Sequence, residues 1–156
     1  MTRIDMQIMH PAFQAYDAFY TMKSGEVAKL IDENEKYIDQ LDAIKNLLVA
    51  VSQGRKTSKD LDFSKDPAKK ALVDAIKNIN PDLITGYQCK EKDIDGFIEL
   101  LNNEAKQITS RINPINLEIN EVLQQRNRVT EIMTEIVRIV NEEASYMVKN
   151  QASRGG

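Results

Sequence analysis

The sequence lacks tryptophan and has few cysteine, histidine, proline or glycine residues. Its 156 residues include one Cys, one His, four Pro and six Gly. A single cysteine, Cys89, excludes an intramolecular disulfide framework and a multi-cysteine zinc site. A single histidine, His10, excludes a histidine-rich metal site. Aromatic residues amount to only 6%, and this composition argues against a β-sandwich or barrel and favours long helices.

Long apolar runs are also absent. No stretch approaches the roughly 18 residues that a membrane-spanning helix needs, so we expect no direct membrane span. Residues 1–11 have neither an apolar core nor a small-residue cleavage site, which predicts that no cleavable secretory signal is present. The net charge is −3 with both signs intermixed, so we expect no nucleic-acid partner.

The strongest positive pattern lies in the C-terminal third. Apolar residues recur alternately every four and three residues from Ile94 to Met147, and only Arg126 and Glu143 break the stripe. A 3.5-residue period held this long is typical of a coiled coil and predicts a helix over 93–149. Pro114 lies off the stripe, and the pattern keeps its phase across it, which favours one kinked helix over two separate ones.

A second apolar stripe runs from Val27 to Val51. Ser24 is a suitable N-cap and Gly54 a suitable terminator, so the sequence predicts a helix over 24–53. Two amphipathic helices joined by a compact insert should pair antiparallel. We therefore expect an all-α fold, an elongated antiparallel helical hairpin (coiled coil) with a small helical insert between the two long helices.

The remaining segments are shorter. The insert, residues 54–92, should hold one short helix that begins at Asp66-Pro67 and stops at Asn80-Pro81. Residues 1–23 are expected to form a short helix against the long one or to stay disordered until a partner binds, and residues 150–156 a frayed tail. Together these parts predict a single elongated coiled-coil domain over 1–156.

The two predicted helices differ in length. About 30 residues of the second helix would have no partner from the first at 1.5 Å rise per residue. An exposed apolar stripe of that size usually marks an interface. We therefore expect the C-terminal half of the second helix to drive association.

Two polar residues interrupt the stripes. Asn34 and Arg126 occupy positions that otherwise face a partner helix. A polar residue at such a position can set the register or the oligomeric state at a cost in stability. The line along which the two stripes meet is called the seam. The alternative for Arg126 is that it extends its aliphatic stem along the seam to reach water, or lies beyond the hairpin.

No combination of residues suggests catalysis. A di-iron bundle needs Glu-x-x-His pairs, which one histidine cannot supply, and the glycines are too isolated to form a phosphate loop. Cys89 has no His or Asn partner nearby in sequence, and His10 is expected to be a surface residue. The sequence thus predicts no enzyme, no metal and no cofactor.

The segment Gln107-Ile108-Thr109-Ser110-Arg111-Ile112-Asn113, followed by residues 118–129 and an apolar run to Val140, resembles a known helix. It is similar to the C-terminal coiled-coil helix of the hydrophilic translocators of bacterial type III secretion systems, the needle-tip (V-antigen-like) proteins and the related filament subunits. The order of parts also resembles the filament subunit. The chain departs from the family in being much shorter than the tip proteins and in ending with a polar tail.

The resemblance implies a structural assembly protein at the tip or filament of a secretion needle. Its partners would be further copies of itself, the needle subunit and a dedicated cytoplasmic chaperone, and it would reach the bacterial surface without a cleavable signal. The positions carried over as an assembly surface are Ile119, Val122, Arg126, Val129, Met133, Ile136 and Val140. The alternative is an intracellular coiled-coil adaptor or chaperone that stays in the cytoplasm and clamps a partner protein, and secretion distinguishes the two.

Overall fold

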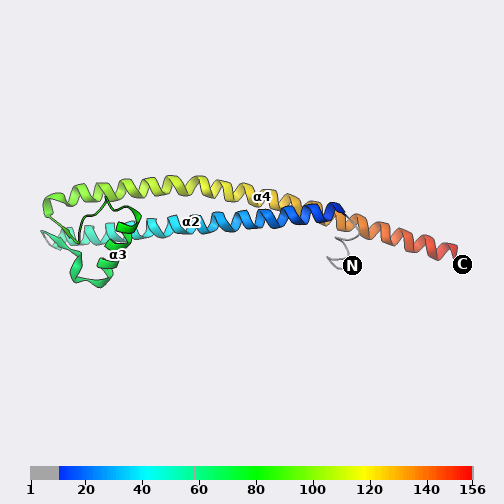
Figure 1. Ribbon diagram of the computed structural model, residues 1–156, viewed down its shortest axis with the longest axis horizontal. Helices are drawn as coiled ribbons and strands as arrows, with labels where there is room; N and C mark the ends of the chain where they lie inside the picture. The colour runs from blue at the N-terminus through cyan, green and yellow to red at the C-terminus, as the bar shows by residue number, and fades with distance from the viewer. Residues whose placement is uncertain (1–10, 58, 156) are drawn as a thin grey trace. The chain divides into compact units, whose positions relative to one another are not determined.

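The computed structural model describes residues 11–57 and 59–155. Expectations for His10 and for the start of the N-terminal segment therefore lie outside the described residues. The elements in chain order are helix α2 (Pro11–Thr57), strand β1 (Leu61–Asp62), 3₁₀ helix η1 (Phe63–Lys65), helix α3 (Pro67–Ile79), strand β2 (Gln88–Cys89), 3₁₀ helix η2 (Glu91–Asp93) and helix α4 (Ile94–Arg154) (Figure 1). The chain is 88% helical, which confirms the all-α class and the helical hairpin.

The described residues group into two compact units. One unit holds the residues up to Leu30 together with those from Glu118 onward, and the other holds residues 31–117. Helices α2 and α4 each contribute to both units, and each unit is described by itself below. The expectation of one domain over 1–156 stays a prediction.

The unit of residues 31–117 has a core shared by α2, the insert and α4. Side chains from all three parts are buried in one cluster, which includes Ile44, Leu47, Val73, Ile76 and Leu101. The antiparallel direction is marked at one end by an ion pair of 2.7 Å between Arg55 and Asp95. This arrangement confirms that the second stripe faces the partner helix.

Helix α3 begins where the sequence predicts. The Asp66 carboxylate accepts hydrogen bonds from the backbone N–H groups of Ala68 and Lys69 at 3.0 and 3.5 Å, and Pro67 occupies the first turn, where a missing N–H costs nothing. The helix ends at Ile79, with Asn80 as its C-cap.

A short antiparallel ladder closes the insert. Leu61 of β1 pairs with Cys89 of β2, and the Phe63 N–H donates to the Tyr87 carbonyl at 2.8 Å. The Tyr87 hydroxyl in turn donates to Asp74 of α3 at 2.6 Å. These bonds fix the loop after α3 against the helix that precedes it.

The other unit pairs the N-terminal part of α2 with the C-terminal part of α4. Phe13 is buried in a cluster with Ile136 and Val140, and Tyr16 and Met133 pack against it. Phe13 lies beside Ile136 and Val140, whereas Tyr20, further along α2, lies beside Arg126, so the two segments run antiparallel here too.

The predicted start of the first helix is wrong. Helix α2 begins at Pro11 rather than at Ser24, because the alternation of the seam continues upstream of Val27 through Lys23, Tyr20, Tyr16 and Phe13. Ser24 lies inside the helix, and its Oγ is buried without a hydrogen-bond partner among the described residues.

The two helix ends also differ from expectation. Helix α2 passes Gly54 and ends at Thr57. A Cβ on Gly54 would lie 2.5 Å from Cδ2 of Leu61, so glycine serves here to let the buried Leu61 pack against the helix. Helix α4 continues to Arg154, beyond the predicted end at Lys149. It runs through Pro114 without interruption, which confirms one helix in place of two.

Candidate assembly surface

The seven positions predicted as an assembly surface lie mostly between α2 and α4, inside the unit formed by residues up to Leu30 and from Glu118 onward. Val122, Val129, Ile136 and Val140 are buried, each with 8% or less of its surface exposed. Ile119, Arg126 and Met133 are half-buried. The expectation that about 30 residues of this stripe lack a partner is wrong, because α2 begins at Pro11 and its first turns cover the stripe as far as Val140.

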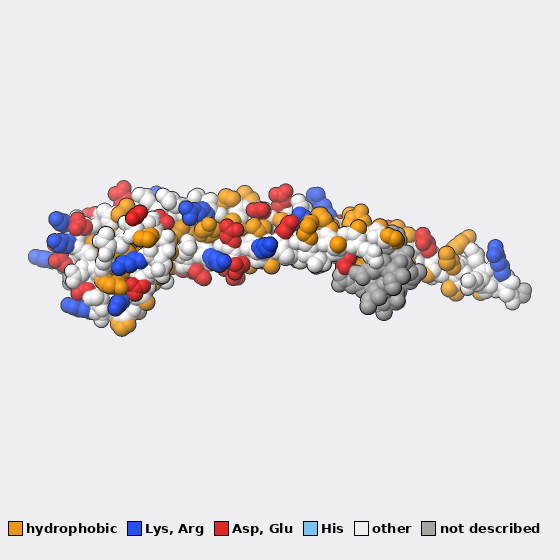
Figure 2. All heavy atoms as spheres, viewed as in Figure 1, with side chains coloured by type: hydrophobic (Ala, Val, Ile, Leu, Met, Phe, Trp, Pro, Cys, Tyr) orange, Lys and Arg blue, Asp and Glu red, His pale blue; other side chains and the backbone are white. Residues whose placement is uncertain are grey.

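Beyond Val140 the stripe is uncovered. Tyr146, Met147 and Val148 have 68%, 64% and 65% of their surfaces exposed. Figure 2 shows hydrophobic side chains on the surface of this C-terminal stretch of α4. Exposed apolar residues scattered singly are ordinary on a protein surface, whereas three in succession on a helix need a reason.

An additional apolar stripe, here called the outer stripe, runs along α4 beside the residues that face α2. Ile132, Ile139 and Tyr146 are spaced seven residues apart, which places them on one face of the helix. Ile132 and Ile139 are 40% and 39% exposed. The sequence reasoning missed this stripe because it followed the 4-3 alternation alone. The seven-residue repeat, one position before Met133, Val140 and Met147, is the signal that identifies it.

Helix α2 presents an apolar face of its own in this unit. Ala12, Ala15, Phe19 and Met22 follow one another at intervals of three and four residues, and all four are exposed. The Lys23 ammonium lies 5.1 Å from the centroid of the Phe19 ring, at the edge of this face. Small and apolar side chains on a helix surface allow another helix to approach closely.

Arg138 forms ion pairs with two carboxylates of its own helix, Glu135 and Glu142. Arg138 Nε donates to Glu135 at 3.0 Å, and its Nη1 donates to Glu142 at 2.5 Å. The hydrogen bond from Arg138 holds the pKa of the Glu135 carboxyl below its ordinary value. The Glu135 carboxylate therefore stays ionised, and the positive charge of Arg138 on the same helix offsets part of its negative charge.

The two polar seam residues each have a partner across the hairpin. Asn34 Nδ2 donates to Asn116 Oδ1 at 3.0 Å. The Arg126 guanidinium carbon lies 5.6 Å from the centroid of the Tyr20 ring, a cation–π distance. Arg126 thus lies against α2 and not beyond the hairpin, while the register-setting role of both residues stays a prediction.

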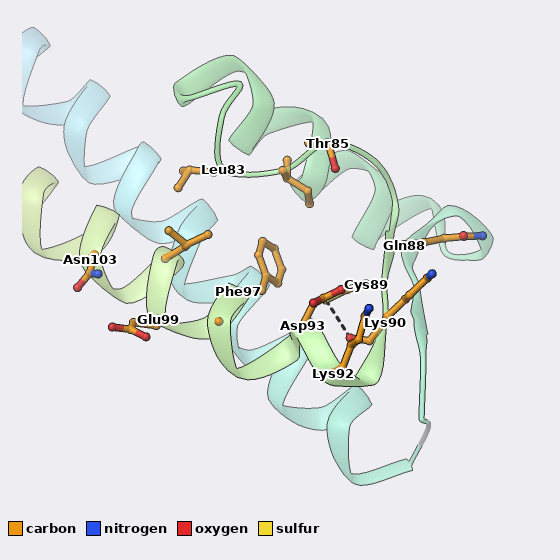
Figure 3. A pocket seen from close by; sticks show the side chains of 13 residues that line it. Leu83, Thr85, Gln88, Cys89, Lys90, Lys92, Asp93, Phe97, Glu99 and Asn103 are labelled. Carbon is orange, nitrogen blue, oxygen red and sulfur yellow. Dashed lines mark hydrogen bonds between the residues drawn. The ribbon is translucent and has the colours of Figure 1, made fainter.

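An open groove of about 940 Å³ lies beside the insert. Figure 3 shows its lining: Leu83 from the loop after α3, residues of β2, and Phe97 and Asn103 from the first turns of α4. The Cys89 thiol at its edge is half-buried. Burial, followed by the nearby Asp93 and Asp60 charges, raises the pKa of this thiol, which disfavours the reactive thiolate.

The described part of the chain contains no group of three or more His, Cys, Asp or Glu side chains placed to hold a metal ion. Within residues 11–57 and 59–155, no helix combines the length and the apolar character that a membrane span requires. The Cys89 thiol donates a long 3.7 Å hydrogen bond to the Lys90 carbonyl.

Comparison of the chain with protein-family models, with curated proteins and with solved structures finds no match in any of the three.

Proposed function

We propose that this chain is a structural assembly protein that associates with copies of itself at the tip or in the filament of a type III secretion needle. The observation that carries the self-association is the exposed outer stripe of Ile132, Ile139 and Tyr146 beside a seam that is already filled. The type III setting is supported by the resemblance of residues 107–140 to the C-terminal helix of the hydrophilic translocators. In this setting the partners are the chain itself, the needle subunit and a cytoplasmic chaperone.

Covering this stripe favours association, against a cost of roughly 4–15 kcal/mol for lost translational and rotational freedom. Burying an isoleucine side chain completely contributes roughly 1.5–3 kcal/mol. Ile132 and Ile139 keep about two fifths of their surfaces exposed and Tyr146 about two thirds, so covering all three from both sides of an interface contributes on the order of several kcal/mol. This gain exceeds what the scattered surface ion pairs of the same helix supply.

The seven seam positions take an indirect part in this proposal. Val122, Val129, Ile136 and Val140 hold α2 against α4, and the paired helices then present the neighbouring stripe. Val129→Asp or Ile136→Asp should therefore open the hairpin, whereas Ile139→Asp should block association and keep the hairpin intact.

Export tests the type III setting directly. The chain is produced in a bacterium with a working type III apparatus and in a matched strain whose apparatus cannot export. We expect the protein in the medium and on the surface of the first strain only. Equal amounts in both media, or none in either, would contradict the proposal, and a cytoplasmic protein such as a metabolic enzyme serves as the control for lysis.

A second candidate is the intracellular adaptor or chaperone that clamps a partner protein. The groove beside β2 favours it, since a concave and partly apolar surface at the insert suits a segment of another protein. The two candidates differ in location. An adaptor stays in the cytoplasm of both strains, and substitutions at Leu100 in the groove, rather than at Ile139, would abolish its function.

A further inference from the structure

We propose that two copies of the chain pair through a twofold axis beside Glu135, with the α4 helices antiparallel, so that Ile132 of each copy packs against Ile139 of the other. This inference rests on the proposed self-association and adds the partner, the direction and the register. A twofold contact closes on itself, so growth of the dimer into a ring or filament uses surfaces other than the outer stripe. All residues that it uses belong to the unit formed by the N-terminal part of α2 and the C-terminal part of α4.

The outer stripe sets the centre of the contact. Ile132 and Ile139 are equally exposed, at 40% and 39%, and a twofold axis midway between them covers both in both copies. The same axis places Tyr146 of one copy against Gln125 of the other. Gln125 is half-buried and lies seven residues before Ile132 on the same face of α4, so the tyrosine ring of the second copy packs over that end of the stripe.

Charge selects this register. Glu121, Arg128, Glu135, Glu142 and Lys149 recur every seven residues along one edge of the stripe. In two antiparallel copies related by the axis beside Glu135, Arg128 of one faces Glu142 of the other, and Glu121 faces Lys149. Each dimer then has four opposite-charge pairs from these positions.

Other registers lose this match. An axis moved to Ile139 would place Arg128 against Lys149 and Glu135 against Glu142, which are like charges and repel. Parallel, in-register pairing would place each charged residue beside the same residue of the second copy, so that every one of these contacts would join like charges. In the proposed register the single like-charge contact is Glu135 with Glu135, and there Arg138 of the same helix is bonded to each carboxylate.

Helix α2 fits the same axis. Phe13 packs against Ile136, so an axis beside Glu135 passes α2 at the level of Ala15. Ala15 of one copy then faces Ala15 of the other, and Phe19 of one copy faces Ala12 of the other. These exposed small and apolar side chains let the two α2 helices pack against each other, so that α2 and α4 of both copies form a four-helix bundle.

Charge reversal with rescue tests the register. The variants are Glu121→Lys, Lys149→Glu and the double variant, with the mass followed by light scattering over a concentration series. We expect the wild type to reach twice its 17.8 kDa, and each single variant to raise the dimer Kd by about tenfold or more, since two attractive pairs become repulsive. The double variant should return to within about threefold of the wild type. A double variant no tighter than the singles overturns the proposal.

Chemical cross-linking tests the axis. In a Cys89→Ser background, Glu135→Cys places two thiols beside the axis, and a short bis-maleimide should join them into a covalent dimer. Asn127→Cys, also exposed, is the matched control: in the proposed register its two introduced thiols are separated by about 24 Å along the helices, so it should give little product. Equal yields from the two variants, or no product from Glu135→Cys, overturns the proposed axis.

The outcomes separate this inference from the proposed function. A chain that forms larger assemblies without the Glu135→Cys cross-link and without charge rescue overturns the register while its self-association stands. A chain that stays monomeric at every concentration overturns the dimer. Export through the type III apparatus is measured independently and decides the cellular setting in either case.

Discussion

Asn34 of α2 and Asn116 of α4 form a hydrogen bond of 3.0 Å across the hairpin, from Nδ2 of Asn34 to Oδ1 of Asn116. Asn34 occupies a seam position that hydrophobic residues fill elsewhere, and its own Oδ1 is buried without a partner in the described structure. The bond is satisfied only when these two residues lie at the same level. The hydrogen bond therefore favours the one register of α2 and α4 that places Asn34 beside Asn116.

The two asparagines should respond oppositely to substitution. Asn34→Leu fills the seam with an apolar side chain and should stabilise the chain by about 1 kcal/mol, while relaxing the register. Asn116→Ala removes the acceptor of the Asn34 amide and should lower the free energy of unfolding by about 0.5–1.5 kcal/mol. Chemical denaturation of both variants and of the double variant checks this, and the double variant should match Asn34→Leu. Equal destabilisation by both single variants would contradict the assignment.

Ile136 and Ile139 form a matched pair that separates the seam from the surface. Ile136 is 8% exposed and packs against Phe13, whereas Ile139 is 39% exposed. Ile136→Ala should lower the free energy of unfolding by about 2–4 kcal/mol because it leaves a cavity. Ile139→Ala should lower it by about 1 kcal/mol or less and should weaken self-association. Denaturation and light scattering on the same samples measure both effects, and a loss of association only in Ile136→Ala would contradict the proposed surface.

Helices and their pairing were predictable because both depend on periodicity. The 3.5-residue repeat identified both long helices, and the Asp66-Pro67 pair identified the start of α3. Ser24 misled the prediction of the first helix, since a serine suits an N-cap as well as a half-buried helical position. The repeat continued to Phe13, and the burial of Phe13 against Val140 outweighs the local preference of one side chain.

The outer stripe was harder to predict for a different reason. Ile132 and Ile139 look like seam residues from their composition, and only the position of α2 shows which of two adjacent apolar columns is covered. Coverage is a property of the pair of helices and not of either sequence segment alone. The groove beside β2 is likewise formed by residues from Leu83 to Asn103, whose proximity depends on the two-residue ladder.

Two glycines of α2 should differ in their tolerance of a methyl group. A Cβ at Gly25 would meet no atom within 4 Å, so Gly25→Ala should stabilise the helix by about 0.5–1 kcal/mol through backbone entropy. At Gly54 the same Cβ would meet Leu61 Cδ2 at 2.5 Å, and Gly54→Ala should gain less than Gly25→Ala or destabilise the insert. Thermal denaturation compares them, and equal stabilisation would mean that Leu61 moves without cost.

The Tyr87 hydroxyl should give the insert a stability that depends on alkaline pH. Its hydrogen bond to Asp74, followed by partial burial and the charge of that carboxylate, raises the pKa of Tyr87 above its ordinary value. A group whose pKa is higher in the folded state contributes its full stability below the unfolded pKa, near 10, and loses it as the pH rises through the folded value. Tyr87→Phe removes only the hydroxyl, because the ring stays in place near the ammonium groups of Lys70 and Lys77.

Denaturation midpoints of the wild type and of Tyr87→Phe at pH 7, 9 and 11 isolate this contribution from the lysines, which titrate in both proteins. We expect the wild type to be more stable at pH 7 and 9, and the difference to shrink at pH 11 as the phenol ionises beside a carboxylate. Asp74→Asn provides the second arm: with the charge removed, the pKa of Tyr87 should fall toward its ordinary value, and absorbance at alkaline pH should report that shift. A difference between wild type and Tyr87→Phe that grows above pH 10 would contradict the bond from Tyr87 to Asp74 as the link between the loop and α3.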